Sequence, residues 1–237
     1  MTVRLMLTCL NDAFYGEVGI ATVRVLEHVG CRVEFDPAQT CCGQPPFNAG
    51  DWSAARPIAE RTVSLFGLNA EDGDPVVMPS ASCAAMLRHG YGALGVGCKT
   101  GRVYELAEYV VDVAGRLEWD GSVSPRRVGF HRACHGRMMG LRDQQEILLR
   151  SIKGIEVVEL GSPEQCCGFG GAFSVTHGKV SEGIGLEKLR QIEQAGVDQV
   201  VSGDMGCVMH LAGLAKKNSV DVSFVHFAQV LAEAIPS

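Results

Sequence analysis

The sequence CCGFGG at residues 166–171 places two adjacent cysteines directly before a glycine-rich turn. A similar sequence, CCGQPP, occurs at residues 41–46, so the two cysteine pairs lie 125 positions apart. Eight of the ten cysteines fall on this repeat: Cys9, Cys41, Cys42 and Cys83 in the first copy, and Cys134, Cys166, Cys167 and Cys207 in the second. Four cysteines in one copy match four in the other at offsets that agree within one residue, which indicates an internal duplication and predicts two similar halves.

The duplication divides the chain of 237 residues into two parts that are each large enough for a small folded unit. We place the boundary in the polar, proline-containing segment that begins near residue 121. The first repeat is expected to cover residues 1–122 and the second residues 123–237.

Strands are expected to alternate with helices in both halves. Short apolar runs predict strands at residues 3–8, 32–35 and 75–78, and again at residues 127–131, 155–160, 199–201 and 221–225. Apolar residues at helical spacing predict helices at residues 17–29, 51–66 and 103–117, and at residues 144–151, 181–195, 207–216 and 226–234. This alternation is typical of an α/β fold, here with a small parallel sheet and flanking helices in each half.

The repeated cysteines follow three different predicted strands in each half. Loops at the carboxyl ends of parallel strands meet at one edge of a sheet, where α/β folds build their sites. Cysteines that are far apart in the sequence are therefore expected to converge on cysteine-bearing loops at that edge, four in each half.

The composition restricts the possible partners and compartments. Hydrophobic residues make up 46% of the chain, which is enough for a folded core, and the net charge of −6 argues against a nucleic-acid partner. No run of about 18 apolar residues is present, so we expect no transmembrane segment. The first residues have the pattern of a buried strand rather than a signal peptide, and we expect a cytoplasmic protein. In that reducing compartment, metal or redox chemistry explains ten cysteines better than disulfides do.

Four cysteines in each half match the ligand count of a 4Fe-4S cluster, in which each of the four irons takes one protein ligand. Adjacent cysteines point in different directions, which suits two irons of one cluster better than two corners of a single ion. The glycines that follow let the backbone approach the cluster and donate N–H groups to sulfur: Gly43 in the first half, and Gly168, Gly170 and Gly171 in the second. The sequence thus predicts one or two clusters per chain.

Two other interpretations of the repeated cysteines remain open. All-cysteine zinc sites usually draw their ligands from two close pairs spaced by two to four residues, a spacing that these eight cysteines lack. Free cysteines also pack as small hydrophobic residues, which is the expected role of Cys31 and Cys98 because they have no counterpart in the other repeat. The glycines at residues 168–171 lack the third glycine of a dinucleotide-binding sequence, which argues against a nucleotide site.

The pattern resembles the cysteine-rich CCG domain family over nearly the whole chain. In that family a cysteine is followed by Cys-Cys-Gly and then by Cys-x-x-Cys, usually twice. The matching sequences here are PSASC at residues 79–83, HRACH at 131–135, CCGFGGAFS at 166–174 and DMGC at 204–207. The chain departs from the family pattern at the first cysteine of the last motif, where it has Ser80 in one half and Asp204 in the other. For these two side chains, helix capping and metal ligation are the competing roles.

Within the family, the likeness is greatest to the small iron–sulfur subunits of three-protein systems that oxidise L-lactate. This implies an electron-transfer subunit that works with two partner proteins, one of them an iron–sulfur protein, in converting L-lactate to pyruvate. Nothing in the chain resembles a flavin or nicotinamide site, so we assign no catalytic residue. Relatives in glycolate and glycerol-3-phosphate oxidation give alternative substrates, and the heterodisulfide reductase relatives give an alternative thiol chemistry. A zinc-binding scaffold is the non-redox alternative.

Five histidines lie near these motifs or at predicted helix ends. His131 and His135 flank Cys134, where a histidine either donates a hydrogen bond to a sulfide or bonds to the backbone. The same alternatives apply to His177 and His210, whereas His226 is expected to cap the last helix.

Overall fold

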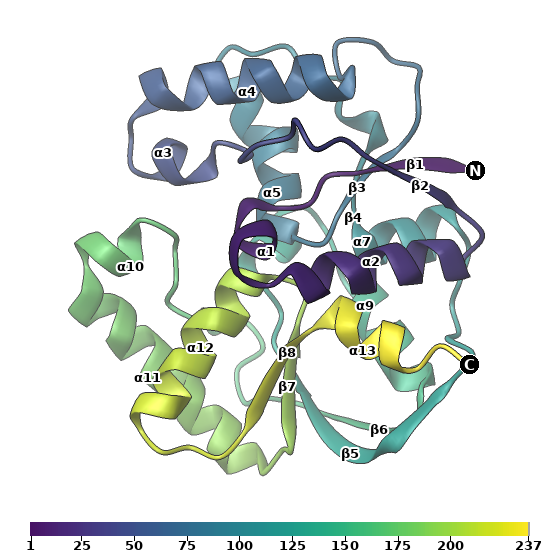
Figure 1. Ribbon diagram of the computed structural model, residues 1–237. Helices are drawn as coiled ribbons and strands as arrows, with labels where there is room; N and C mark the ends of the chain where they lie inside the picture. The colour runs from purple at the N-terminus through teal and green to yellow at the C-terminus, as the bar shows by residue number, and fades with distance from the viewer. Residues whose placement is uncertain (237) are drawn as a thin grey trace.

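The computed structural model describes residues 1–236 and contains two four-stranded parallel sheets (Figure 1). The strands of the first sheet lie in the order β2-β1-β3-β4, and those of the second in the order β6-β5-β7-β8. The strands are β1 (Thr2–Leu5), β2 (Arg32–Phe35), β3 (Val76–Met78), β4 (Val103–Glu105), β5 (Ser122–Phe130), β6 (Lys153–Val158), β7 (Gln199–Ser202) and β8 (Ser223–His226). Because the second order repeats the first, the predicted α/β fold with two duplicated halves is confirmed.

Helices connect the strands in both halves. The first half contains α1 (Cys9–Phe14), α2 (Gly16–His28), α3 (Gln44–Asn48), α4 (Trp52–Phe66), α5 (Ala81–Ala85), α6 (Tyr91–Ala93) and α7 (Leu106–Glu108), with π-helical turns at Met86–Gly90 and Tyr109–Val113 and a 3-10 turn at Thr100–Arg102. The second half contains α8 (Cys134–Met138), α9 (Gln144–Ser151), α10 (Phe173–Thr176), α11 (Gly178–Ala195), α12 (Met205–Lys217) and α13 (Phe227–Glu233). None of the helices in the described part of the chain is long and apolar enough to cross a membrane.

One prediction about the first half is wrong. Residues 103–117 were expected to form a single helix, but Val103–Glu105 is the edge strand β4, which pairs in parallel with β3. Glu105 then caps α7 by accepting the backbone N–H groups of Ala107 and Glu108, so the helix begins only after it. The three residues Val103–Glu105 are too few to be distinguished in the sequence from the first turn of the helical pattern that follows.

The two halves share a hydrophobic core. Figure 1 shows α2 and α13 side by side at the junction of the halves, and Val25 and Leu26 of α2 belong to the same buried cluster as Leu231 of α13. The indole Nε1 of Trp119 also donates to the carbonyl of Leu231 at 2.9 Å. The halves therefore pack against each other through apolar contacts. The division at residues 122 and 123 stays a prediction.

A buried carboxyl at this junction predicts a pH dependence of stability. Glu105 is fully buried and accepts from Gln145 Nε2 of α9 at 2.9 Å. Burial raises the pKa of Glu105 to about 7. The carboxyl therefore keeps its proton to higher pH in the folded chain than in the unfolded chain. Its contribution to the unfolding free energy is fully present below the ordinary pKa of a glutamate and is lost as pH rises through about 7.

We expect the Glu105→Gln substitution, which keeps a capping oxygen, to remove this dependence. Between pH 5 and pH 8, the parent should lose up to about 3 kcal/mol of unfolding free energy relative to the variant. Urea denaturation of both proteins across that range measures the difference. Parallel pH profiles would show that Glu105 does not titrate in this way.

Candidate metal centre

The four repeated cysteines of the first half come together as two pairs. Cys9 is the first residue of α1, directly beyond β1, and its Sγ lies 3.5 Å from Cys41 Sγ. Cys83 lies in the first turn of α5, beyond β3, and its Sγ lies 3.4 Å from Cys42 Sγ. The adjacent Cys41 and Cys42 thus point to different partners, as the sequence predicted.

The second half repeats this arrangement. Cys134 begins α8 beyond β5 and interacts with the thiol of Cys166. Cys207 lies in the first turn of α12, beyond β7, and its Sγ is 2.9 Å from Cys167 Sγ. All four thiols are free, so each half presents four sulfur donors and no disulfide.

Glycines allow the backbone to reach sulfur at equivalent positions in the two halves. The N–H group of Gly43 donates to Cys41 Sγ at 3.4 Å, and that of Gly168 donates to Cys166 Sγ at 3.3 Å. Both glycines have positive φ angles, +85° and +90°, which other residues rarely adopt. Gly170 and Gly171 instead form the turn that leads into α10.

Electrostatics favour one thiolate in each half. Hydrogen bonds from Cys42 and Cys9 lower the pKa of Cys41 to about 3, and the N–H of Gly43 adds to this effect. Hydrogen bonds from Cys134 and Cys167 likewise hold the pKa of Cys166 well below its ordinary value. A thiolate is the form that binds metal.

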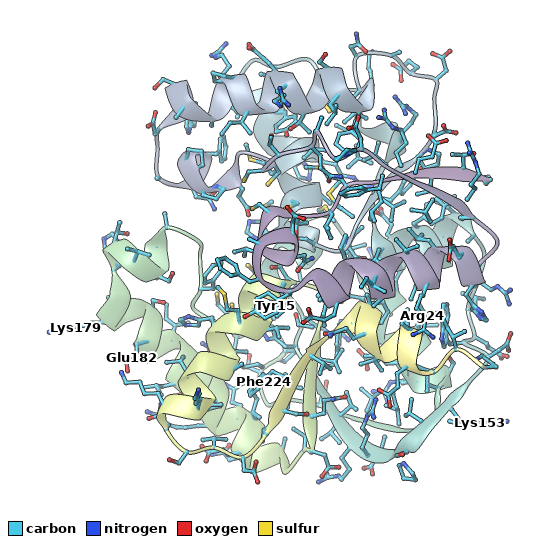
Figure 2. All side chains as sticks on the ribbon, viewed as in Figure 1. Tyr15, Arg24, Lys153, Lys179, Glu182 and Phe224 are labelled. Atoms are coloured by element: carbon cyan, nitrogen blue, oxygen red, sulfur yellow. The ribbon has the colours of Figure 1, made fainter. Side chains whose placement is uncertain are left out.

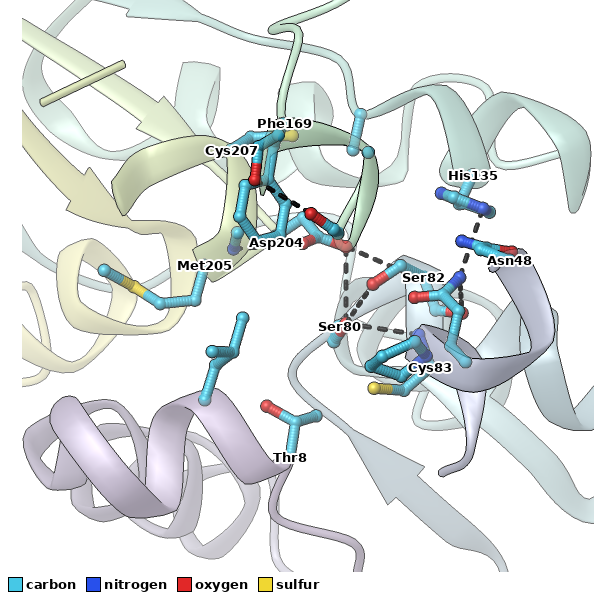
Figure 3. A pocket seen from close by; sticks show the side chains of 18 of the residues that line it. Thr8, Asn48, Ser80, Ser82, Cys83, His135, Phe169, Asp204, Met205 and Cys207 are labelled. Carbon is cyan, nitrogen blue, oxygen red and sulfur yellow. Dashed lines mark hydrogen bonds between the residues drawn. The ribbon is translucent and has the colours of Figure 1, made fainter. Parts of the chain in front are cut away.

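All eight repeated cysteines line one cavity of about 340 Å³. Figure 3 shows Cys83 and Cys207 on different sides of this cavity, with Asp204 and Ser80 between them. The sequence predicted a site in each half but gave no indication that the two sites face a common space.

Asp204 and Ser80 join the two halves at this cavity. Ser80 Oγ caps α5 by accepting the N–H of Cys83, and Asp204 Oδ1 caps α12 by accepting the N–H of Gly206 at 3.2 Å. Asp204 Oδ2 also accepts from Ser82 N–H at 3.0 Å and from Ser80 Oγ at 3.3 Å (Figure 3). These contacts show both side chains as helix caps, so the metal-ligand alternative has no support from the geometry.

The two cysteines outside the repeat lie elsewhere. Cys31 Sγ is 3.4 Å from Tyr109 Oη, and Cys98 packs against the first-half core. Neither lines the cavity. This placement agrees with the packing role expected for both residues.

The histidines have different environments. His226 caps α13 by accepting the N–H of Ala228 at 3.1 Å, as predicted. His135 lies 3.2 Å from Gln44 Nε2, which links the two halves across the cavity wall. His131 is buried, neither of its ring nitrogens has a partner in the described part of the chain, and burial lowers its pKa to about 3.

The donor set fits a thiolate-bound metal group. Soft sulfur ligands select zinc, Cu(I) or iron–sulfur clusters among the biological metals. The four sulfurs of each half form two pairs. One sulfur in each half, that of Cys41 or Cys166, also accepts a backbone N–H group. A ring nitrogen of His131 and the sulfurs of Cys167 and Cys207 also lie within 4.8 Å of one another.

Comparisons with known proteins agree with the duplication. The family model CCG, a cysteine-rich domain, matches residues 3–88 and again residues 128–212. Lactate utilization protein A of Geobacillus kaustophilus is 40% identical over 240 residues, which is 98% of either chain. Lactate utilization protein A of Oceanobacillus iheyensis is 37% identical over 98% of this chain and 96% of that protein. Lactate utilization protein A 1 of Bacillus anthracis is 33% identical over 99% of both.

A solved structure shares the fold. The crystal structure of a hypothetical protein from Helicobacter pylori superposes on all of this chain with a TM-score of 0.61. The sequence identity is 11%, and this chain covers 49% of the other, so it spans about half of that protein. The likeness concerns the fold alone.

Proposed function

The chain belongs to the cysteine-rich CCG domain family, and on that premise we propose that it is the iron–sulfur electron-transfer subunit of a system that oxidises L-lactate to pyruvate. The observation that carries the proposal is the convergence of all eight repeated cysteines on one cavity. Relatives of similar length that bear the name lactate utilization protein A support the substrate.

We assign one 4Fe-4S cluster to each half. Cys9, Cys41, Cys42 and Cys83 would hold the first, and Cys134, Cys166, Cys167 and Cys207 the second. Such clusters accept and release single electrons. The chain's contribution is to supply thiolates at Cys41 and Cys166, to donate N–H groups to sulfur, and to bury Cys42, Cys83, Cys167 and Cys207 away from water.

The electron count agrees with two sites. Oxidation of L-lactate to pyruvate releases two electrons and two protons, and a chain with two one-electron groups can hold both electrons. We propose that the substrate is oxidised on another subunit and that an acceptor outside this chain receives the electrons. The two partner proteins, one of them an iron–sulfur protein, would supply these steps in the cytoplasm.

The cavity opening suits contact with a partner. Val175 of α10 lines the cavity, yet its side chain is 85% exposed. We propose that a partner covers this side of the cavity opening. Contact here would bring the partner's redox group close to the cysteines, which electron transfer requires.

A zinc-binding scaffold is the second candidate. The set of His131, Cys167 and Cys207 has the nitrogen and sulfur donors that zinc binds. A tetrahedral site would need a fourth ligand, and the first half has Met6 in place of the histidine. The duplicated sulfurs therefore favour the iron–sulfur assignment.

Deletion of the gene tests the substrate directly. We expect the deletion strain to lose growth on L-lactate as sole carbon source, to grow normally on glucose, and to recover with the parent gene. Glycolate and glycerol-3-phosphate serve as comparison substrates, because loss of growth on one of these alone would assign the chain to that system. Normal growth on all three would contradict the proposed function.

A further inference from the structure

His131 lies directly behind the sulfurs of the second half. Its backbone N–H continues the sheet by donating to Val201 O at 2.8 Å, which fixes the residue at the end of β5. The side chain is 1% exposed, and a ring nitrogen lies within 4.8 Å of the sulfurs of Cys167 and Cys207. It is not part of the cavity lining, so the imidazole faces these sulfurs from the protein interior.

The imidazole has an N–H group to donate and no protein acceptor for it. An imidazole carries at least one N–H group whether it is neutral or protonated. Both ring nitrogens lack a partner among residues 1–236. A buried, unpaired donor costs free energy, which a thiolate sulfur in front of the ring would offset.

The first half has no such donor. Met6 occupies the equivalent position, because its N–H donates to Val77 O at 2.9 Å just as that of His131 donates to Val201 O. Val77 lies six residues before Cys83, and Val201 six residues before Cys207. Met6 is also buried, but its thioether cannot donate a hydrogen bond.

A buried cation is also confined to the second half. Lys188 of α11 is 1% exposed, and its Nζ donates to the carbonyls of Leu160 at 2.9 Å and Ser162 at 3.1 Å. Charged residues elsewhere on α11, such as Lys179 and Glu182, point outward (Figure 2). The sequence gives no signal for this burial beyond the place of Lys188 on the apolar side of the helix.

The first half has a neutral residue in place of this lysine. The buried positions of α4 and α11 match at an offset of 126, which aligns Thr62 with Lys188. Another pair of positions has an apolar residue in the first half and a histidine in the second. His210 of α12 aligns with Met86, because these two residues are separated by the same 124 positions as Cys83 and Cys207.

The histidine donors and the buried lysine of the second half act on its metal group in one direction, whereas the carboxylate of Asp204, which stands where the first half has Ser80, acts in the other. A nearby positive charge, or a hydrogen bond to a sulfur ligand, stabilises the reduced state, which carries one more negative charge. The reduction potential of an iron–sulfur group therefore rises with such contacts.

From this geometry, and resting on the proposed function, we infer that the two metal sites are unequal. The second site is reduced first, and His131 is the positioning residue that sets the difference by donating to the sulfur of Cys167 or Cys207. The first electron that enters the chain therefore resides at the second site, and a second electron reduces the first site.

Redox titration of the full chain, reconstituted with iron and sulfide without oxygen and followed by EPR, tests this inference. We expect two one-electron steps. His131→Met, which copies the first half, should lower the reduction equilibrium constant of the upper step about tenfold, equivalent to about 59 mV for one electron. The lower step should not move. His131→Gln, which keeps an N–H donor, should shift the upper step by less.

Met6→His provides the reciprocal test and should raise the lower step toward the upper one. If the His131→Met variant takes up iron at one site only, the Met6→His variant still tests the inference. Unchanged steps in both substitutions, or a shift of the lower step by His131→Met, would overturn the inference while leaving the proposed function intact. A parent chain that takes up no iron would overturn both.

Discussion

The Cys167→Ser variant is expected to lose about half of the iron of the chain, with one redox step gone and the other kept. Cys167 is buried, and its sulfur lies 2.9 Å from that of Cys207, so its loss would leave the second half with three of its four repeated thiols. The first-half cysteines are on a separate sheet and should keep their metal group. Iron analysis and EPR of the anaerobically purified variant measure the loss.

The same substitution should abolish growth on L-lactate, because an electron path through two sites fails when one is missing. Cys98→Ser is the matched control, since Cys98 lies outside the repeat and away from the cavity. It should keep the iron content and the growth of the parent. If Cys167→Ser grew on L-lactate like the control, the second site would have no part in the pathway.

The Asp204→Ala variant is expected to lose about 2–4 kcal/mol of unfolding free energy. The carboxylate caps α12 through Gly206 and accepts from Ser82 N–H at 3.0 Å in the other half. Removing it leaves the buried N–H of Gly206 and the half-buried N–H of Ser82 without this acceptor. The helices that carry Cys83 and Cys207 would then lose their shared anchor, so iron content should fall at both sites.

Asp51→Ala is the control for capping alone. Asp51 caps α4 through Ala54 N–H at 3.0 Å, but it is exposed and makes no contact between the halves. Urea denaturation of both variants should show a clearly smaller loss for Asp51→Ala. Equal losses would mean that Asp204 acts as an ordinary helix cap with no role in holding the halves together.

The sequence predicted the duplicated α/β fold well because its signals are local. Cysteine spacing showed the repeat, and short apolar runs marked seven of the eight strands. Strand β4 was missed because Val103–Glu105 runs directly into a segment with helical spacing. Pairing with β3, which is distant in the sequence, decides that those residues form a strand.

The sequence identified the cysteines that line the candidate site but not their arrangement. The eight cysteines and the N–H donors Gly43 and Gly168 follow from residue types and spacing. That the two halves face one cavity depends on how α2 and α13 pack, which no local pattern encodes. The buried state of His131 and Lys188 likewise depends on tertiary packing.

Iron, sulfide and zinc content, together with EPR spectra before and after dithionite, test the central claim most directly on protein purified without oxygen. The account predicts about eight irons per chain, with a signal that appears on reduction. Zinc without iron and without a signal would contradict electron transfer and identify the repeated cysteines as a structural metal site.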